Sequence, residues 1–173
     1  VGKILGMHRA MKSGIGSFAL QKENLKIGAI VAVNCLGNVI DPLTAQNLAG
    51  PLDQSAQFIL DTEEIMINTY PDQQDPFSGN TTIGAVLTNA KLDKAQAEKL
   101  ASMSQNGYAR TMRPAHSMVD GDTIFALSTG KLEADLNLLG LLGARVMERA
   151  VLQAVKYAHS SHGLKSFSDF SSL

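Results

Sequence analysis

The chain has 173 residues, of which 45% are hydrophobic and 18% are charged, so we expect one domain with a core of aliphatic side chains. Its formal net charge of −1 gives no electrostatic case for binding nucleic acid or an anionic membrane surface. The single cysteine, Cys35, excludes an intrachain disulfide and a multi-cysteine metal site. No apolar run reaches the ~18 residues that span a bilayer. With one cysteine and no such run, we expect a cytoplasmic protein, and we expect no cofactor.

The N-terminal part is predicted to begin as a helix and to continue as strands. Apolar residues at helical spacing indicate the end of a helix over residues 1–12, and glycines break it over residues 13–17. A short strand is expected at residues 18–20. The apolar, β-branched run at residues 26–33 predicts a strand covered on both faces, and extended chain resumes at residues 39–40.

The middle of the chain is a long polar segment at residues 50–80, with several prolines. A loop of ~30 residues is uncommon inside a compact domain and is usually functional or disordered. A brief helix is predicted within it at residues 59–67, and a second buried strand follows at residues 82–89. Asn80 and Thr81 therefore stand where the loop becomes a strand.

The C-terminal part predicts two helices on either side of a third strand. Asp93 has the pattern of an N-cap with a capping box, so a helix is expected over residues 93–113, with Gly107 as a point of interruption. The third strand is predicted at residues 123–128 and a long helix at residues 135–159. Strands and helices in this order favour a layered α/β or α+β fold.

The Asn80–Thr81 junction is the first candidate for chemistry. If this bond were cut, Thr81 would carry a free α-amine beside its own hydroxyl, which is a nucleophile with a built-in base. An Asn-Thr dipeptide on its own is more often an ordinary pair of turn residues. The hypothesis that Thr81 is a nucleophile therefore depends on the neighbouring motifs.

A second candidate is the pair of carboxylates Asp120 and Asp122, which flank Gly121 just before a strand. Alternate residues of an extended chain point to one side, so the two carboxylates can act together. They can bind a cation, hold a catalytic amine or share one proton. The alternative is an Asp-Gly turn whose carboxylates are solvated or cap the strand.

Asn34 and Lys12 complete the candidates. Asn34 follows a buried strand, and a side-chain amide at that place can donate to an oxyanion; the alternative is a turn residue. Lys12 precedes the glycine-rich turn and can lie near a site; the alternative is a solvated lysine at a helix end.

Together, five ordered blocks resemble one family of self-processing hydrolases. The family includes L-aminopeptidase/D-esterase and the β-peptidyl aminopeptidases, with nylon-oligomer hydrolase as a relative. The blocks are Lys12-x-Gly-x-Gly, residues 28–42 with Asn34, Asn80-Thr-Thr-Ile-Gly84, Arg110-x-x-Arg113-Pro-x-His116, and residues 120–129 beginning with Asp120-Gly-Asp122. Five blocks in a fixed order are much more specific than any one of them.

The resemblance implies an α/β fold, namely a four-layer αββα sandwich of the N-terminal-nucleophile-like, DOM type. It also implies a single hydrolase domain over residues 1–173 and a precursor cut between Asn80 and Thr81. The α segment would then end at Asn80, and the β segment would span residues 81–173. Members of the family extend further on the N-terminal side, so we expect this chain to lack the start of the α segment.

The resemblance also assigns roles to the candidate residues. Thr81 would be the nucleophile, Asp120 and Asp122 would orient and polarise it, Asn34 would stabilise the oxyanion, and Lys12 would lie near the nucleophile. The implied substrate is a small aminoacyl or peptide amide or ester, and the implied assembly is a homo-oligomer. No metal, nucleic acid or membrane takes part in this scheme.

Two other functions remain open from the sequence. A non-catalytic binding or assembly subunit could keep the same fold. An acyltransferase resembling ornithine acetyltransferase also processes itself at a threonine, although its neighbouring motifs do not match this chain.

Overall fold

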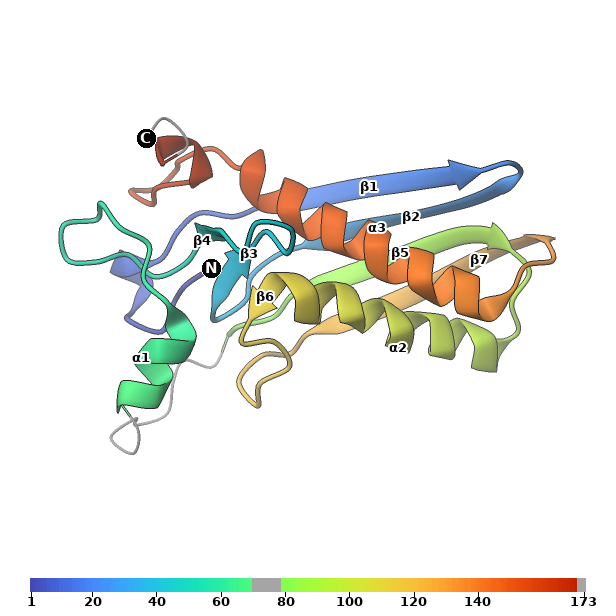
Figure 1. Ribbon diagram of the computed structural model, residues 1–173, viewed down its shortest axis with the longest axis horizontal. Coiled ribbons are helices and arrows are strands. Elements are labelled where there is room, and N and C mark those ends of the chain that lie inside the picture. Colours follow the sequence, from blue (N-terminus) through green and yellow to red (C-terminus); the bar gives the residue numbers. More distant parts are fainter. Residues whose placement is uncertain (70–78, 171–173) are drawn as a thin grey trace.

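The computed structural model describes residues 1–69 and 79–170, which are organised around a four-stranded sheet (Figure 1). Its strands are β1 (Ile15–Lys22), β2 (Leu25–Ala32), β5 (Ile83–Ala90) and β7 (Thr123–Leu132), in the order β1-β2-β5-β7. The first three strands pair antiparallel, whereas β5 and β7 are parallel. Parallel neighbours need a long crossover, and the chain between β5 and β7 supplies it.

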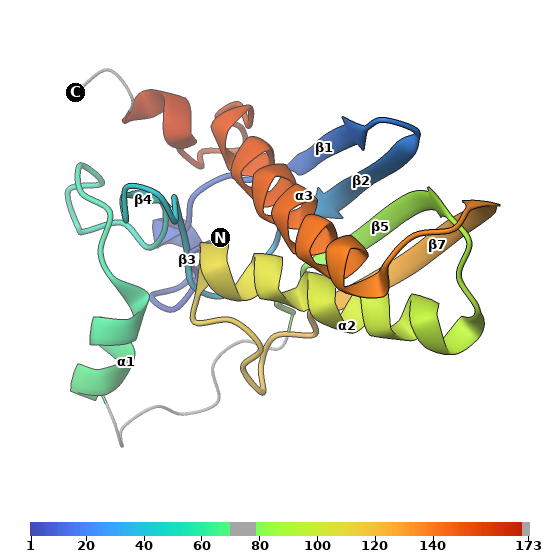
Figure 2. The ribbon, with the colours of Figure 1, turned by 45° about the vertical axis from the view of Figure 1, so that its right-hand side comes forward.

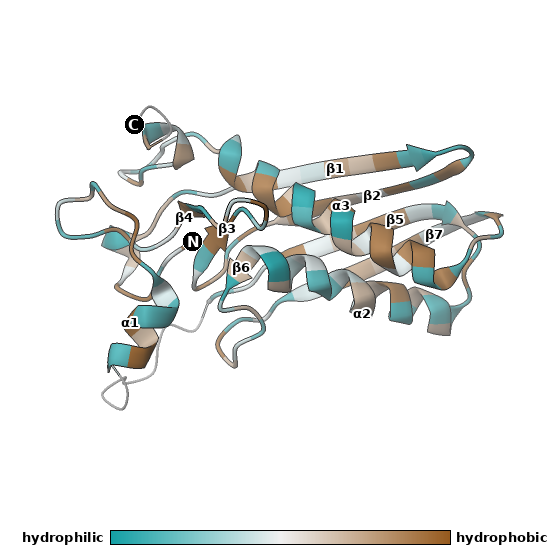
Figure 3. Cartoon of the chain, in the orientation of Figure 1, coloured by the Kyte–Doolittle hydropathy of each residue, from teal (hydrophilic) through white to brown (hydrophobic). Residues whose placement is uncertain are grey.

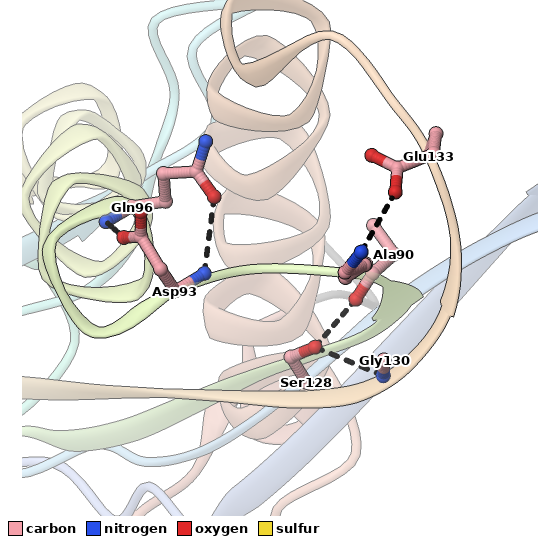
Figure 4. A network of polar contacts seen from close by, with 7 residues as sticks. Ala90, Asp93, Gln96, Ser128, Gly130 and Glu133 are labelled. Carbon is pink, nitrogen blue, oxygen red and sulfur yellow. Dashed lines mark hydrogen bonds and ion pairs between the residues drawn. The ribbon is translucent and has the colours of Figure 1, made fainter.

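Two long helices, α2 (Lys94–Thr111) and α3 (Leu136–Lys156), lie side by side across one face of this sheet (Figures 1 and 2). The predicted capping box of α2 is confirmed. The side chain of Asp93 accepts from the backbone N–H of Gln96 (2.7 Å), and the side chain of Gln96 accepts from the backbone N–H of Asp93 (3.0 Å; Figure 4). This local device fixes where the helix begins.

The expected interruption of α2 at Gly107 is wrong, because the helix is continuous there. Gly107 lies instead at a close contact with α3: an added Cβ would come within 2.7 Å of the carbonyl oxygen of Ala144. Along α3, hydrophobic and hydrophilic bands alternate (Figure 3). The helix buries Leu139 and Met147, whereas Leu141 is 47% exposed.

Smaller elements gather beyond the end of the main sheet where β5 and β7 begin (Figure 1). They comprise a second sheet of β3 (Asn38–Ile40), β4 (Asn47–Ala49) and β6 (Met112–Arg113), in the order β4-β3-β6, and the helix α1 (Thr62–Thr69) within the long polar segment. Two short 3-10 helices span Met7–Arg9 and Phe167–Asp169. The brief helix expected in the polar segment is thereby confirmed, a few residues later than predicted.

The helix predicted over residues 1–12 is wrong. Gly2 (φ 70°) and Gly6 (φ 94°) adopt left-handed backbone conformations, which interrupt a right-handed helix. The chain between them is hydrogen-bonded to the turn after β2: the N–H of Gly2 donates to Gly37 O (3.0 Å) and that of Lys3 to Leu36 O (2.8 Å). These bonds bring Lys3 beside the end of β2.

The expectation that the strands are covered on both faces is also wrong for the described residues. Burial alternates along β2 and β5, and the buried residues face α2 and α3. The opposite face carries six exposed apolar side chains: Ile15, Ile30, Ile83, Leu87, Phe125 and Leu127. We call this surface the open face. A continuous apolar run shows that both faces of a strand are apolar, but not what covers them.

Candidate active site

The Asn80–Thr81 junction lies beside the start of β7. Asn80 forms a parallel bridge with Asp120. The carbonyl oxygen of Asn80 accepts from the N–H of Gly121 (2.9 Å) and from the Thr81 hydroxyl (2.5 Å). An added Cβ on Gly121 would come within 2.8 Å of Thr81 Oγ1, so this close approach requires glycine.

Asn34 borders the junction from the end of β2. Its carbonyl oxygen accepts from the N–H of Thr81 (3.1 Å), and its side-chain Nδ2 donates to the carbonyl of Gly79 (3.0 Å). Its Oδ1 accepts from Lys3 Nζ (2.8 Å), which also lies 3.3 Å from Asn34 O and 3.5 Å from Gly79 O. The structure thus brings Asn34 and Lys3 together around the bond predicted to be cut.

Lys3 is a site residue that the sequence reasoning missed. It is 6% exposed, and burial lowers the pKa of its amine, an effect that Cys35 and Asp120 oppose. An amine with a lowered pKa is suited to accept a proton. The available signal was a lone lysine in the apolar stretch from Val1 to Leu5, which already indicates burial.

Lys12, the lysine chosen from the sequence, lies in different surroundings. Its Nζ donates to the carbonyl of the adjacent Ser13 (2.5 Å), and its N–H donates to the carbonyl of Lys165 in the C-terminal tail (2.7 Å). Neither of these contacts reaches Asn34 or Thr81.

The two carboxylates have different partners. Asp120 accepts from the N–H of Leu36 (3.0 Å) through Oδ1 and from the hydroxyl of Ser117 (2.8 Å) through Oδ2. Oδ1 of Asp122 accepts from the N–H of Thr82 (2.8 Å), the residue after Thr81. Asp122 therefore contacts the backbone next to Thr81 and not the Thr81 hydroxyl.

Asp122 is the less completely hydrogen-bonded of the two carboxylates. Its Oδ2 is buried and has no hydrogen-bond partner among the residues that the structure describes. Burial raises the pKa of Asp122, and the neighbouring charge of Asp120 adds to this rise. The N–H and the side chain of Thr82, and to a smaller extent the charge of His116, act in the opposite direction. A carboxyl group whose pKa is raised by burial and by a specific neighbouring charge is a candidate for a functional site.

Two further features of the described residues bear on the kind of site. They contain no group of three or more His, Cys, Asp or Glu side chains that could hold a metal ion. In this part of the chain, no helix is long and apolar enough to cross a membrane.

The sequence of the chain matches a known protein family. The model of Peptidase family S58 matches residues 2–168. The chain belongs to peptidase family S58. The resemblance inferred from the ordered motifs is thereby confirmed.

Several relatives of this S58 chain are curated proteins. An uncharacterised aminopeptidase of Mycobacterium leprae (strain TN) is 36% identical over 175 residues, which cover 91% of this chain and 48% of the relative. An uncharacterised aminopeptidase of Mycobacterium tuberculosis (strain H37Rv) is 32% identical over 182 residues, covering 92% of this chain and 52% of the relative. A 6-aminohexanoate-oligomer endohydrolase of Paenarthrobacter ureafaciens is 26% identical over 160 residues, covering 83% and 44%. The chain therefore spans about half the length of these relatives.

Solved structures share the fold of this S58 chain. A β-aminopeptidase of a Burkholderia species has a TM-score of 0.54 at 19% identity, covering 85% of this chain and 42% of that one. The L-aminopeptidase D-Ala-esterase/amidase of Ochrobactrum anthropi, described as a variant of the Ntn hydrolase fold, has a TM-score of 0.55 at 18% identity, covering 91% and 45%. The α/β fold predicted from the sequence is thus confirmed.

Proposed function

We propose that this chain carries the catalytic centre of a self-processing N-terminal-nucleophile aminopeptidase or amidohydrolase, with Thr81 as the nucleophile. The proposal rests on the hydrogen bonds that the carbonyl oxygen of Asn80 accepts. This oxygen already accepts from the N–H of Gly121 (2.9 Å), and the Thr81 hydroxyl lies against it. A bound carbonyl is polarised for attack, and the same N–H can stabilise the oxyanion that forms.

Self-cleavage would start with attack of Thr81 Oγ on the carbonyl carbon of Asn80. The hydroxyl proton passes to the neutral amine of Lys3, whose lowered pKa favours this role. When the C–N bond breaks, Lys3 returns the proton to the Thr81 nitrogen, and the Asn80 acyl group stays on Oγ as an ester. Water hydrolyses the ester, which releases Asn80 as a carboxylate and restores the hydroxyl.

After cleavage, the same groups would serve the substrate. The carbonyl of Asn34 already accepts from the Thr81 nitrogen (3.1 Å) and would hold the new amine in place. Once Gly79 has left, Asn34 Nδ2 becomes available to donate to the oxyanion of the substrate. Asp120 and Asp122 supply negative charge that orients this amine, and the amine shuttles the proton. We assign the lysine of the site to Lys3 and not to Lys12.

The remaining features of the whole protein follow the same scheme. We infer one hydrolase domain, cut into an α segment that ends at Asn80 and a β segment over residues 81–173. In the four-layer αββα arrangement, another sheet, distinct from the β4-β3-β6 sheet, would pack on the open face, and the six exposed apolar side chains of this face support that packing. We further infer a cytoplasmic homo-oligomer. The names of the relatives, aminopeptidase and 6-aminohexanoate-oligomer endohydrolase, support a small aminoacyl or peptide amide as substrate.

Intact-mass analysis of freshly purified protein tests the cleavage. We expect two fragments, one beginning at Thr81, from the wild type and from Thr81→Ser, which keeps the hydroxyl. Thr81→Ala should remain one chain. If wild type and Thr81→Ala have the same mass pattern, the proposal is wrong.

Hydrolysis of aminoacyl p-nitroanilides then separates an enzyme from a non-catalytic binding or assembly subunit. We expect turnover by the wild type and none by Thr81→Ala. Cleaved protein without turnover on any aminoacyl amide or ester would support the non-catalytic alternative.

A further inference from the structure

Ser117, in the loop before β7, is tied to Asp120 by two hydrogen bonds. The N–H of Asp120 donates to the carbonyl oxygen of Ser117 (3.1 Å), which closes a turn of four residues. The hydroxyl of Ser117 donates to Oδ2 of Asp120 (2.8 Å). One residue therefore holds both the backbone and the side chain of Asp120, and the proposed function assigns it no role.

The other carboxylate oxygen of Asp120 is held from a distant segment. Oδ1 accepts from the N–H of Leu36 (3.0 Å), in the turn after β2. Leu36 is fully buried, whereas Ser117 and Asp120 are half-buried. The bonds from Leu36 and Ser117 reach different oxygens of one carboxylate, so together they restrict the rotation of this side chain.

The peptide unit after Asp120 carries the donor on which the proposed self-cleavage depends. The N–H of Gly121 donates to the carbonyl oxygen of Asn80 (2.9 Å). This N–H belongs to the same planar unit as the carbonyl group of Asp120, so the position of Asp120 sets its direction. Gly121 has no side chain that could hold it in place. The direction of its N–H therefore depends on the bonds that its neighbours make.

The backbone just before Ser117 adopts an unfavourable conformation. His116 has a φ of 57°, in the left-handed region that favours glycine. Such a conformation persists where the surrounding contacts impose it, and it is found at sites where it serves positioning. The two bonds between Ser117 and Asp120 follow directly in the chain and are contacts of this kind.

We propose that Ser117 is a positioning residue: its two bonds to Asp120 hold the next peptide unit so that the N–H of Gly121 points at the carbonyl oxygen of Asn80. The consequence for self-cleavage rests on the proposed function, because this N–H takes part in a reaction only if the bond after Asn80 is cut. Ser117 acts through Asp120 and not on the reacting atoms.

Hydrogen exchange at the N–H of Gly121 is the direct test. Asp-Gly occurs once in the sequence, at residues 120–121, so carbon-13 in the aspartate carbonyl groups and nitrogen-15 in the glycines give this amide its own NMR signal. The full chain carries Thr81→Ala, which should keep it uncut. We expect Ser117→Ala to speed the exchange by about fivefold. Ser117→Thr keeps the hydroxyl and should exchange at the unchanged rate.

Ser128→Ala is the matched control for Ser117→Ala. The hydroxyl of Ser128 donates to the carbonyl of Ala90, where β5 ends, so its loss should not alter exchange at Gly121 (Figure 4). Unchanged exchange in folded Ser117→Ala would overturn the proposal, and so would an equal acceleration in Ser128→Ala. If Ser117→Thr accelerates exchange as much as Ser117→Ala does, the hydroxyl is not the cause and the proposal is wrong.

Rates of self-cleavage connect this inference with the reaction. With Thr81 present, Ser117→Ala should slow self-cleavage by roughly tenfold, because a displaced donor stabilises the oxyanion less well. In an Asp120→Ala background, Ser117→Ala should cause no further loss, since the hydroxyl no longer has its acceptor. Losses that add in the double variant would show that Ser117 does not act through Asp120.

Failure of this inference and failure of the proposed function can be told apart. If the wild type remains one chain, the proposed function is wrong. Exchange at Gly121 in the uncut protein still decides whether Ser117 positions this N–H.

Discussion

The two ends of the parallel pair β5–β7 use their polar groups in different ways. At the far end, the hydroxyl of Ser128 donates to the carbonyl of Ala90 and accepts from the N–H of Gly130 (3.1 Å; Figure 4). Lys91 pairs with Glu133 nearby (3.2 Å). At the site end, Asp122 keeps an oxygen without a partner among the described residues, and its pKa is raised.

The difference indicates what each end contributes. The polar groups of the far end close turns and begin helices, which stabilises the fold. At the site end, Asp122 and Lys3 are both largely buried, and burial disfavours their charged forms. Buried charges of this kind destabilise a fold and are expected where chemistry requires them. Variants at the two ends should therefore separate activity from stability.

Replacing Lys3 should have the largest effect on activity. Lys3→Met keeps the length of the side chain and removes the amine, so loss of the proton acceptor should slow self-cleavage by roughly 10²- to 10⁴-fold. Stability should change little, because the relief from burying a polar amine is opposed by loss of its hydrogen bond to Asn34 Oδ1. Intact-mass time courses and thermal unfolding measure the two quantities.

Lys12→Met is the matched control for Lys3→Met, since Lys12 bonds to the adjacent Ser13 instead of Asn34. We expect it to cleave at the wild-type rate. A rate loss in Lys12→Met with none in Lys3→Met would reverse our assignment of the site lysine.

Replacing Asp122 should have the next largest effect. In Asp122→Asn, the side-chain oxygen can still accept from the N–H of Thr82, but the negative charge is lost. We expect self-cleavage and hydrolysis to slow by about 10²-fold. The matched far-end variant is Asp135→Asn at the N-cap of α3, where an amide still caps the helix. If both variants keep wild-type rates, Asp122 has no role in the reaction.

Replacing Asp93 tests the far end itself. Asp93→Ala removes the side-chain half of the capping box of α2 and should lower the free energy of unfolding by about 1 kcal/mol. The rates of self-cleavage should not change, because the cap lies at the opposite end of α2 from the site. Denaturant unfolding measures the loss; an accompanying fall in rate would contradict the separation of the two ends.

Sequence reasoning succeeded where the cause is local. Asp93 and Asp135 were expected to begin helices, and each accepts from a backbone N–H three residues later. Asn34, Asn80, Thr81 and Asp120 lie far apart in sequence, and the family resemblance, not a local pattern, grouped them; their segments are in contact in the structure, and their roles stay predictions.

The errors arose where distant parts of the chain decide the outcome. Lys3 reaches Asn34 because Gly2 and Gly6 adopt positive φ values, which no helical spacing reveals. The open face was missed because an apolar run does not show which neighbours cover it. The unequal partners of Asp120 and Asp122 depend on the turn after β2 and on β5, which lie far away in sequence.

The smallest expected effect is the pH dependence of stability caused by Asp122. Its pKa is higher in the folded state than in the unfolded state, so the folded state binds this proton more tightly. The stability that it contributes is fully present below the unfolded pKa of about 4 and is lost as the pH rises through the folded pKa. In a Thr81→Ala background, Asp122→Asn should abolish the decrease in the free energy of unfolding over this pH range, whereas Asp135→Asn should retain that decrease. Activity should rise over the same pH range, since the charged form of Asp122 is the one that holds the Thr81 amine. If stability and activity both rise with pH, the ionised form of Asp122 does not destabilise the folded state, and this prediction is wrong.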